Sequence, residues 1–422
     1  MYKRQDDNIP IQAEGNTQQL QEFDRVFIQL FSDQWKLTAG DFFMARPKSY
    51  FMNFNKKVKG GSFEMELHPT KNSVMKPSIS AAVSKGKFAR NVIQGVEGNQ
   101  GPYRLVGAEN ENFIIVLSGT EKIYIDGRLM KRGTEFDYVI DYNTAELTFT
   151  TNRLITKDIR IVAEFQYSDR NYARSLVHFG NDFKSEKLRL NLHVYSEQDS
   201  RNQPLQQELS DQDKLLLGQI GDSLNQAIVP NINVVDFSEN VVLYKMTDTL
   251  GYDSVFVYST NPDSAIYQLG FSYLGPNQGN YIQVQSSANG KVYQWVQPIG
   301  NIPQGDYEPV ILLVTPKTRQ MAIFAGQYDY QKDAYVSWEG AVSNNDINTF
   351  SDRDSEDDIG YALKVNTLNK LSLSGDKNPW KFKVGTGYEY VDKYFTPIER
   401  FRSVEFQRDW NITNVQFSSD QH

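Results

Sequence analysis

Residue types that could do chemistry are sparse along this chain and lie far apart. The four histidines, His68, His178, His193 and His422, show no spacing typical of metal ligands. His68 and His193 lie on the polar sides of alternating segments, where we expect solvated side chains, since a metal site needs several converging ligands. The chain has no cysteine, which excludes disulfide bonds, thiolate zinc sites and cysteine nucleophiles.

An acidic loop is the strongest candidate for binding a metal. Its residues Asp352, Asp354, Glu356 and Asp358 could offer carboxylate oxygens to calcium. The loop lacks the glycine and the terminal glutamate of an EF-hand, which favours a solvated loop. The chain contains neither a G-x-S-x-G nucleophile elbow nor a phosphate-binding P-loop. We therefore predict a protein that is not an enzyme and holds no cofactor.

Aromatic residues are the other candidates for functional contacts. The chain has 25 Phe and 24 Tyr although its hydrophobic content is only 39%, an aromatic excess typical of β-rich envelope proteins. Trp295, Trp338 and Trp380 could stack on sugars or lie at a membrane interface, although packing is the default role of such residues. The expected lipid-facing or interface residues are Trp338, Trp380, Phe382, Tyr388, Phe406 and Trp410.

The overall charge gives no sign of nucleic-acid binding. The net charge is −8, from 44 basic and 52 acidic residues scattered along the chain. No run approaches the roughly 18 apolar residues that a transmembrane helix needs. Alternating strands that cross a membrane would escape this criterion.

The segment 118–168 predicts a complete small β-module. Asp126-Gly127 is a two-residue hairpin signal, and Asn143-Thr144 marks a second turn. The segment 210–227 is the one convincing helix, because Ser210 and Asp213 form a capping-box pattern ahead of helically spaced leucines. Short strands between Gly, Pro and Asn turns from 232 to 315 suggest a β-sandwich.

Longer alternating segments follow in the last hundred residues. Four of them, at 334–343, 361–365, 380–390 and 403–412, separate apolar from polar side chains consistently. A strand of 11 residues is ~37 Å long and, tilted by ~40°, spans roughly the apolar height of an outer membrane. A soluble sheet with one wet face gives much the same alternation. Four strands are too few for a closed barrel, so closure needs the early strands or further sequence.

We therefore expect an all-β fold. It is an antiparallel long-strand meander, either a partial outer-membrane-type β-barrel or a large open sheet, with inserted small β-sandwich modules and one short helix. The expected divisions are an unstructured or artefactual start at 1–19, an antiparallel strand region at 20–104, the small β-module at 105–170, a strand extension at 171–204, the helix with a β-sandwich at 205–315, and the long-strand meander at 316–422.

Several stretches resemble a known family. They include GVEGNQGPYRLVGAEN, VLSGTEKIYIDGRLMKRGTEFDYVIDYNTAELTFT, YSTNPDSAIYQLGFSYLG and ERFRSVEFQRDWN. They resemble large, mostly uncharacterised envelope proteins from Bacteroidota, from about residue 20 to the C-terminus. The family members are longer, so the resemblance implies that this chain is a fragment. The module also resembles modules of the SprA-type translocon of type IX secretion, and the chain resembles the plug subunit of that translocon. The resemblance brings no catalytic residue.

These observations together favour a non-enzymatic β-protein of the cell envelope. We expect it at the outer membrane or its periplasmic face, acting in secretion or surface assembly through β-rich interfaces. The expected partners are the outer membrane and other envelope or secretion proteins, with no nucleic acid and no small-molecule cofactor. One alternative is a secreted glycan-binding protein or glycoside hydrolase, with aromatics beside a groove. Another is a periplasmic partner subunit of a translocon that docks by edge-strand pairing.

Overall fold

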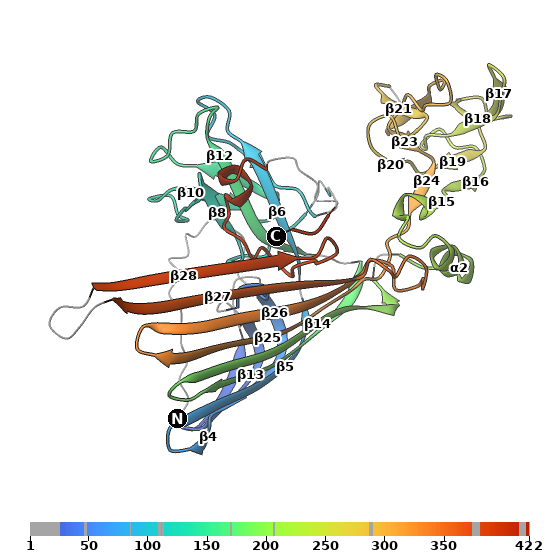
Figure 1. Ribbon diagram of the computed structural model, residues 1–422. Coiled ribbons are helices and arrows are strands. Elements are labelled where there is room, and N and C mark those ends of the chain that lie inside the picture. The colour runs from blue at the N-terminus through green and yellow to red at the C-terminus, as the bar shows by residue number, and fades with distance from the viewer. Residues whose placement is uncertain are drawn as a thin grey trace. The chain divides into compact units, whose positions relative to one another are not determined.

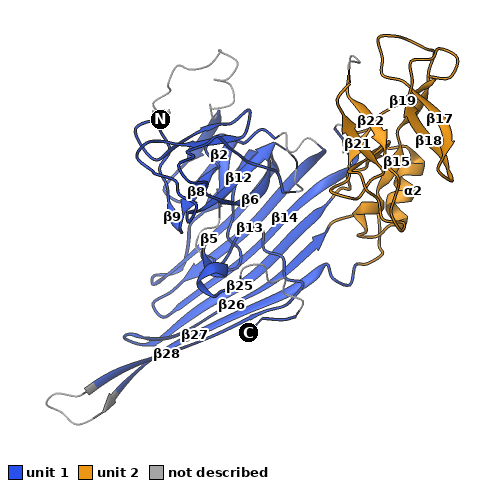
Figure 2. Cartoon of the chain, turned by 90° about the horizontal axis from the view of Figure 1, so that it is seen from above, with its two compact units in different colours: residues 1–206, 317–346, 355–422 blue, residues 207–316, 347–354 orange. Residues whose placement is uncertain are grey.

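The structure is a computed structural model, and the chain forms two compact units. The structure describes residues 26–45, 49–84, 86–108, 111, 114–168, 171–205, 207–286, 290–373, 380–412 and 419–421. Unit 1 comprises residues 1–206, 317–346 and 355–422, and unit 2 comprises residues 207–316 and 347–354 (Figure 2). Strands make up 56% of the residues and helices 4%, which confirms the all-β prediction. The expected start at 1–19 lies outside the described residues.

Unit 1 is built on an 11-stranded antiparallel sheet. Figure 1 shows its long strands side by side. The order is β1 (Phe27–Phe31), β2 (Trp35–Ala45), β3 (Asn55–Met65), β5 (Ser73–Ser84), β13 (Tyr172–Lys184), β14 (Leu188–Pro204), β25 (Thr318–Gln331), β26 (Ala334–Asp346), β27 (Ile359–Leu373) and β28 (Trp380–Val391), and β4 (Leu67–Thr70) pairs with β5. Of the two forms that the sequence left open, the described residues show a large open sheet.

The register of this sheet follows from the alternation in the sequence. On β26, Val336, Trp338 and Val342 share one face, as predicted for 334–343. Directly opposite residues of antiparallel strands lie on the same face, so the apolar set of each strand joins that of the next. Phe324, for example, lies between Leu192 and Gly340. One face of the sheet is therefore apolar across many strands.

Unit 1 also contains the small β-module, which has two sheets. One consists of β6 (Gly86–Gln94), β12 (Arg160–Ser168), β8 (Lys122–Ile125) and β9 (Arg128–Leu129), and the other of β10 (Tyr138–Asp141), β11 (Glu146–Phe149) and β7 (Tyr103–Arg104). The predicted hairpin at Asp126-Gly127 joins β8 and β9, with φ of 47° and 83° at its two central residues. A two-residue turn with both φ values positive suits this sequence. Ile123, Leu147 and Phe165 are fully buried between the sheets.

Unit 2 begins with α2 (Asp211–Gln219), and its capping box at Ser210 and Asp213 is confirmed. A 3-10 turn at Leu224–Gln226 follows. The remaining elements are short strands, as predicted for 232–315. They are β15 (Ile228–Pro230) with β24 (Val310–Leu312); β16 (Ile232–Val234), β19 (Tyr267–Leu269), β17 (Tyr244–Thr249) and β18 (Tyr252–Tyr258); and β20 (Ser272–Tyr273), β23 (Tyr307–Glu308), β21 (Tyr281–Val284) and β22 (Val292–Trp295).

The prediction of a strand at 403–412 is wrong. This segment contains a helical turn, α3 (Phe406–Asp409), in which the N–H of Asp409 donates to the carbonyl of Glu405 at 2.9 Å. Val404 and Glu405 are buried, whereas Trp410 is 71% exposed. The segment pairs with no strand in the described residues, so its alternating pattern does not correspond to a strand of any sheet there. Among the described residues, no helix is long and apolar enough to cross a membrane.

Candidate functional site: the two faces of the large sheet

One face of the large sheet is apolar and exposed. Leu192, in the middle of the sheet, is 43% exposed, and its cross-strand partner Phe324 is 50% exposed. The row continues to the sheet edge, where Tyr388 is 51% exposed. We call this surface the apolar face; its exposed large side chains are Ile28, Leu30, Trp35, Leu37, Ile79, Val83, Val177, Phe179, Leu192, Val194, Phe324, Tyr328, Val342, Tyr361, Leu363, Leu371, Phe382, Val384 and Tyr388.

The size of the apolar face is unusual for a protein surrounded by water. With side chains of about 150 Å² or more and exposed fractions near one half, it presents on the order of 1,000 Å² of apolar surface. The largest apolar patch of a typical soluble monomer is only about 300–600 Å². At about 25 cal/mol per Å², covering this face with an apolar medium would contribute on the order of 25 kcal/mol. The face is therefore a candidate contact surface for lipid or protein.

The opposite face, which we call the polar face, is buried along the central strands and exposed at the edge strands β1 and β28. On β14 the outward Leu192 and Val194 alternate with His193, Tyr195 and Glu197, all three of which are buried. A soluble antiparallel sheet places its apolar side chains against the core and its polar side chains in water. On β14 this sheet does the reverse, and on the neighbouring β25 the buried face carries the apolar Met321 and Ile323.

A buried carboxylate on the polar face binds the chain between β2 and β3. Glu339 of β26 accepts hydrogen bonds from the Ser49 hydroxyl at 2.6 Å and from the N–H groups of Tyr50 at 3.0 Å and Phe51 at 2.7 Å. Phe51 is fully buried, with its ring 5.5 Å from that of Phe395. The segment that links two strands of the sheet is thereby fixed against the polar face.

A second carboxylate binds the same segment from the edge strand. Glu389 of β28 accepts hydrogen bonds from the Tyr50 hydroxyl at 2.7 Å, from Lys364 Nζ at 3.0 Å and from Arg402 Nη2 at 2.9 Å. Burial raises the pKa of Glu389, but these three hydrogen bonds outweigh it, and the net pKa is lowered. Lys364 Nζ also lies 3.4 Å from the centre of the Tyr50 ring.

Further charges on the polar face form a buried network. Glu197 accepts a hydrogen bond from the Tyr195 hydroxyl at 2.8 Å and lies 3.7 Å from Lys56 Nζ. Burial raises the pKa of Glu197, yet Lys56 and Arg174 lower it more, to about 2. Arg174 donates to both carboxylate oxygens of Asp199, at 2.7 and 3.1 Å. These acids are paired with cations, which gives the network a structural role.

The expectation of a solvated His193 is wrong. His193 is 3% exposed and stacks on His178, with His193 Nδ1 3.2 Å from His178 Nε2. The opposite ring nitrogen, Nε2, lies 3.0 Å from Asp182 Oδ1. Because His178 and Asp182 contact different nitrogens of His193, the three do not converge on one ion. The misassignment arose because the polar side of this sheet is its interior.

Of the other two histidines, the structure describes only His68. His68 on β4 is exposed, as expected, and its Nε2 lies 3.5 Å from Glu66. His422 lies outside the described residues. Gly180 explains how the buried rings of His178 and His193 fit together. A Cβ at position 180 would lie 2.6 Å from His193 Nδ1, so only glycine leaves room for the His193 ring. No sequence signal distinguished this glycine from others.

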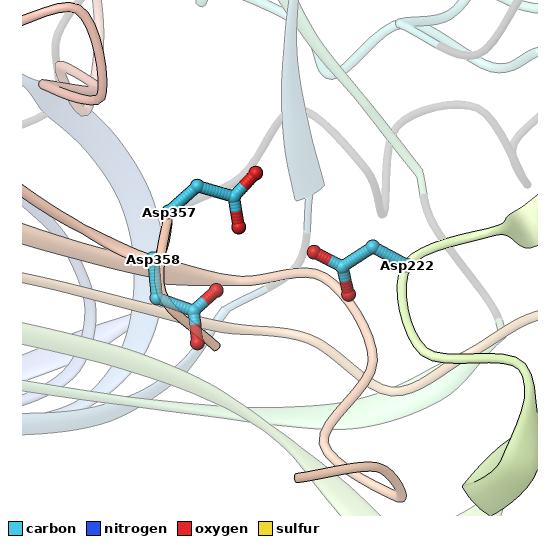
Figure 3. Close-up of side chains that lie close together, drawn as sticks. All are labelled: Asp222, Asp357 and Asp358. Atoms are coloured by element: carbon cyan, nitrogen blue, oxygen red, sulfur yellow. The ribbon is translucent and has the colours of Figure 1, made fainter. Parts of the chain in front are cut away.

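The acidic loop is divided between the two units. Asp352 and Asp354 belong to unit 2, Glu356 and Asp358 belong to unit 1, and all but the half-buried Asp358 are exposed. Figure 3 shows Asp357 beside Asp358, just before β27; Asp222, also labelled there, is a residue of unit 2. Neighbouring acidic residues do not by themselves make a metal site. Calcium binding by this loop stays a prediction from the sequence.

The predicted interface aromatics have different positions. Phe382 and Tyr388 lie exposed on the apolar face, and Trp338 lies half-buried on the same face, over Gly326 of the neighbouring strand. Trp380 begins β28, but its side chain lies outside what the structure describes. The remaining two are not on the sheet, since Phe406 begins the helical turn α3 and Trp410 follows it, with their rings 6.0 Å apart.

The segment before α3 connects the module to the rest of unit 1. Arg400 donates to both oxygens of Glu164 on β12, at 2.5 and 3.3 Å. Arg90 of β6 donates to the carbonyl of Val404 at 3.1 Å. On the other side, Gln166 accepts a hydrogen bond from the N–H of Lys57 on β3 at 3.2 Å. Charged and amide side chains therefore hold the module in place.

Unit 2 contains a groove of about 770 Å³ between its two four-stranded sheets. Its lining combines Trp295, Tyr258 and Tyr293 with aliphatic side chains, amides and hydroxyls. The described lining residues include no carboxylate. Aromatic rings beside neutral hydrogen-bonding groups can bind uncharged polar ligands, but the groove offers no pair of acids for hydrolysis.

The comparisons with known proteins give one match. Residues 88–169, which cover β6 to β12 of the module, match the model of a family described as a domain of unknown function, DUF8818. Neither a curated protein nor a solved structure matches the chain. The match agrees with the module as a folding unit, and it covers only a minor part of the chain.

Proposed function

We propose that the chain is a non-enzymatic cell-envelope protein of the outer membrane, in which the apolar face of the large sheet contacts lipid. In this proposal it acts in secretion or surface assembly through its β-rich surfaces. The observation that carries the proposal is the reversal of the two faces, with Leu192 and Phe324 exposed and His193 and Glu197 buried.

The length of the apolar rows supports lipid as the contact. On β25 the row from Ala322 to Tyr330 covers eight residue steps, or ~26 Å along the strand. The apolar band of strand-built outer-membrane proteins is about 25 Å tall. Polar residues of the same face, Gln320 on β25 and Ser196 on β14, adjoin one another at one end of the rows. A membrane sets a fixed height for the apolar band, whereas a contact with another protein sets none, so a band of this height favours lipid.

Site-specific labelling tests the proposal directly, because the chain has no native cysteine. Leu192→Cys and Phe324→Cys variants are labelled with an environment-sensitive fluorophore and reconstituted into vesicles. We expect blue-shifted emission that brominated lipids quench. The matched control is Ile299→Cys in unit 2, which is 70% exposed and should stay unquenched. Equal, water-like emission from all three labels would overturn the proposal.

The groove of unit 2 supports glycan binding as a second candidate function. Trp295 and the half-buried Tyr258 line the groove together with Gln294, and aromatic rings beside an amide are groups that can bind sugars. Titration with neutral oligosaccharides should change the tryptophan fluorescence, and Trp295→Ala should abolish the change. Binding that is unaffected by this substitution would place the glycan elsewhere.

A further inference from the structure

The last strand of the large sheet, β28, has one paired edge and one open edge. It pairs with β27 over its whole length, and in the described residues no strand pairs with its other side. A single bridge begins such a pairing: the N–H of Val391 donates to Gln421 at 2.9 Å, and the N–H of Gln421 donates back at 2.8 Å. The open edge therefore already accepts one residue in antiparallel register.

The bridge shows which backbone groups point away from β27. In an antiparallel ladder, alternate residues direct both their N–H and C=O groups to the same side. Because Val391 directs its groups toward Gln421, the same holds for Glu389, Gly387, Gly385 and Lys383. Residues 381–388 are all exposed. The open edge thus presents a row of backbone donors and acceptors.

The inference rests on the proposed function, because this row of backbone groups needs a partner strand only if the sheet lies in lipid. Water can satisfy an exposed sheet edge, but hydrocarbon cannot, and each unsatisfied backbone group in lipid costs several kcal/mol. The apolar face extends to β28 through Phe382 and Val384. A sheet whose face lies in lipid at this point needs a neighbour at the same edge.

We propose that the open edge of β28 is an interaction surface that receives an antiparallel strand from a partner polypeptide. The alternation of β28 defines the chemistry of that strand. On the outer side, apolar residues would continue the row of Phe382 and Val384. On the inner side, small or acidic residues would lie opposite Lys381 and Lys383.

Charge complementarity favours acidic residues at the inner positions. Lys383 Nζ lies 3.8 Å from Asp333, a carboxylate that Lys370 also contacts at 3.3 Å. Two lysines thus share one acid, and Lys381 is a further exposed cation on the same strand. A strand that alternates apolar with acidic or glycine residues supplies the missing negative charge and continues both faces of the sheet.

Glycine 385 permits a test with a matched control. Its N–H points to the open edge, so Gly385→Pro removes a donor that an added strand needs without removing a bond to β27. Gly385→Ala keeps the N–H, and the nearest atom to its Cβ would be the carbonyl oxygen of Thr367 at 3.6 Å, an ordinary contact. The probe is a fluorescent peptide of roughly nine residues, about the length of a strand, that alternates Val or Tyr with Asp or Gly.

Binding is measured by fluorescence anisotropy with the full chain in detergent. We expect the wild type and Gly385→Ala to bind equally, Gly385→Pro to bind at least about tenfold more weakly with an unchanged unfolding midpoint, and a scrambled peptide not to bind. Equal binding by the proline variant, or by the scrambled peptide, overturns the inference. A dimer through β28 that excludes the peptide also overturns it, in favour of a second copy. Because vesicle labelling of Leu192→Cys is independent of this edge, failure of the peptide alone leaves the proposed function standing.

Discussion

A charged residue in the middle of the apolar face gives the sharpest test of its surroundings. Leu192 lies on β14, near the centre of the sheet, and is 43% exposed. In water, Leu192→Arg at such a position changes the free energy of unfolding by only about 0.5 kcal/mol or less. In lipid, an arginine at the bilayer midplane costs about 2–4 kcal/mol. The two environments therefore predict results that differ by about 1.5 kcal/mol or more.

The same strand provides the control. Gln198 lies on the same side of β14 as Leu192, six residues or ~20 Å further along, and is exposed. An arginine at Gln198 would lie near the membrane surface, where the cost falls to about 0–1 kcal/mol. Both variants are refolded into vesicles across a urea gradient and followed by tryptophan fluorescence. We expect the folding equilibrium of Leu192→Arg to fall by at least about fivefold relative to Gln198→Arg. Equal equilibria would refute the placement of the apolar face in lipid.

Three further predictions concern the interior. Glu339→Leu should lower the free energy of unfolding by about 3 kcal/mol or more, since three donors of segment 49–51 lose their acceptor, whereas Glu339→Gln should cost less; urea denaturation measures both. The pKa of Glu197 is lowered to about 2 in the folded state, so its charge stabilises the fold above the unfolded pKa near 4.5. This contribution to the free energy of unfolding should disappear as the pH falls from about 4.5 to 2. In Glu197→Gln the free energy of unfolding should depend less on pH over this range. Asn348→Ala should destabilise unit 2 by about 1–3 kcal/mol, measured by hydrogen exchange of α2, because the buried amide donates to the carbonyls of Leu217 and Gly221 at the end of that helix.

Local signals explain which elements could be predicted from the sequence. The turn at Asp126-Gly127 and the cap at Ser210 depend on residues a few positions apart, so their chemistry acts within one segment. The strand prediction for segment 403–412 failed for the opposite reason. Its alternation was as regular as that of 334–343, but a strand exists only where a neighbour pairs with it.

The contacts of the polar face could not be predicted, because they join residues far apart in the chain. Glu339 meets Ser49 across 290 positions, and Glu389 meets the Tyr50 hydroxyl across 339. Only the order of strands in the sheet brings these segments together. His178 and His193 are closer in sequence, yet their contact also requires the register of β13 on β14 and the glycine at position 180.

The sequence by itself determined the period-two alternation, the turns and therefore the large antiparallel sheet. It did not determine which side of that sheet is the interior. An alternating strand has one apolar and one polar row in either case, and its pattern is the same whether the apolar row faces a core or the outside. The tertiary structure decided the question, because the segments around Phe51 and Phe395 fill the polar side and leave Leu192, Phe324 and Tyr388 outward.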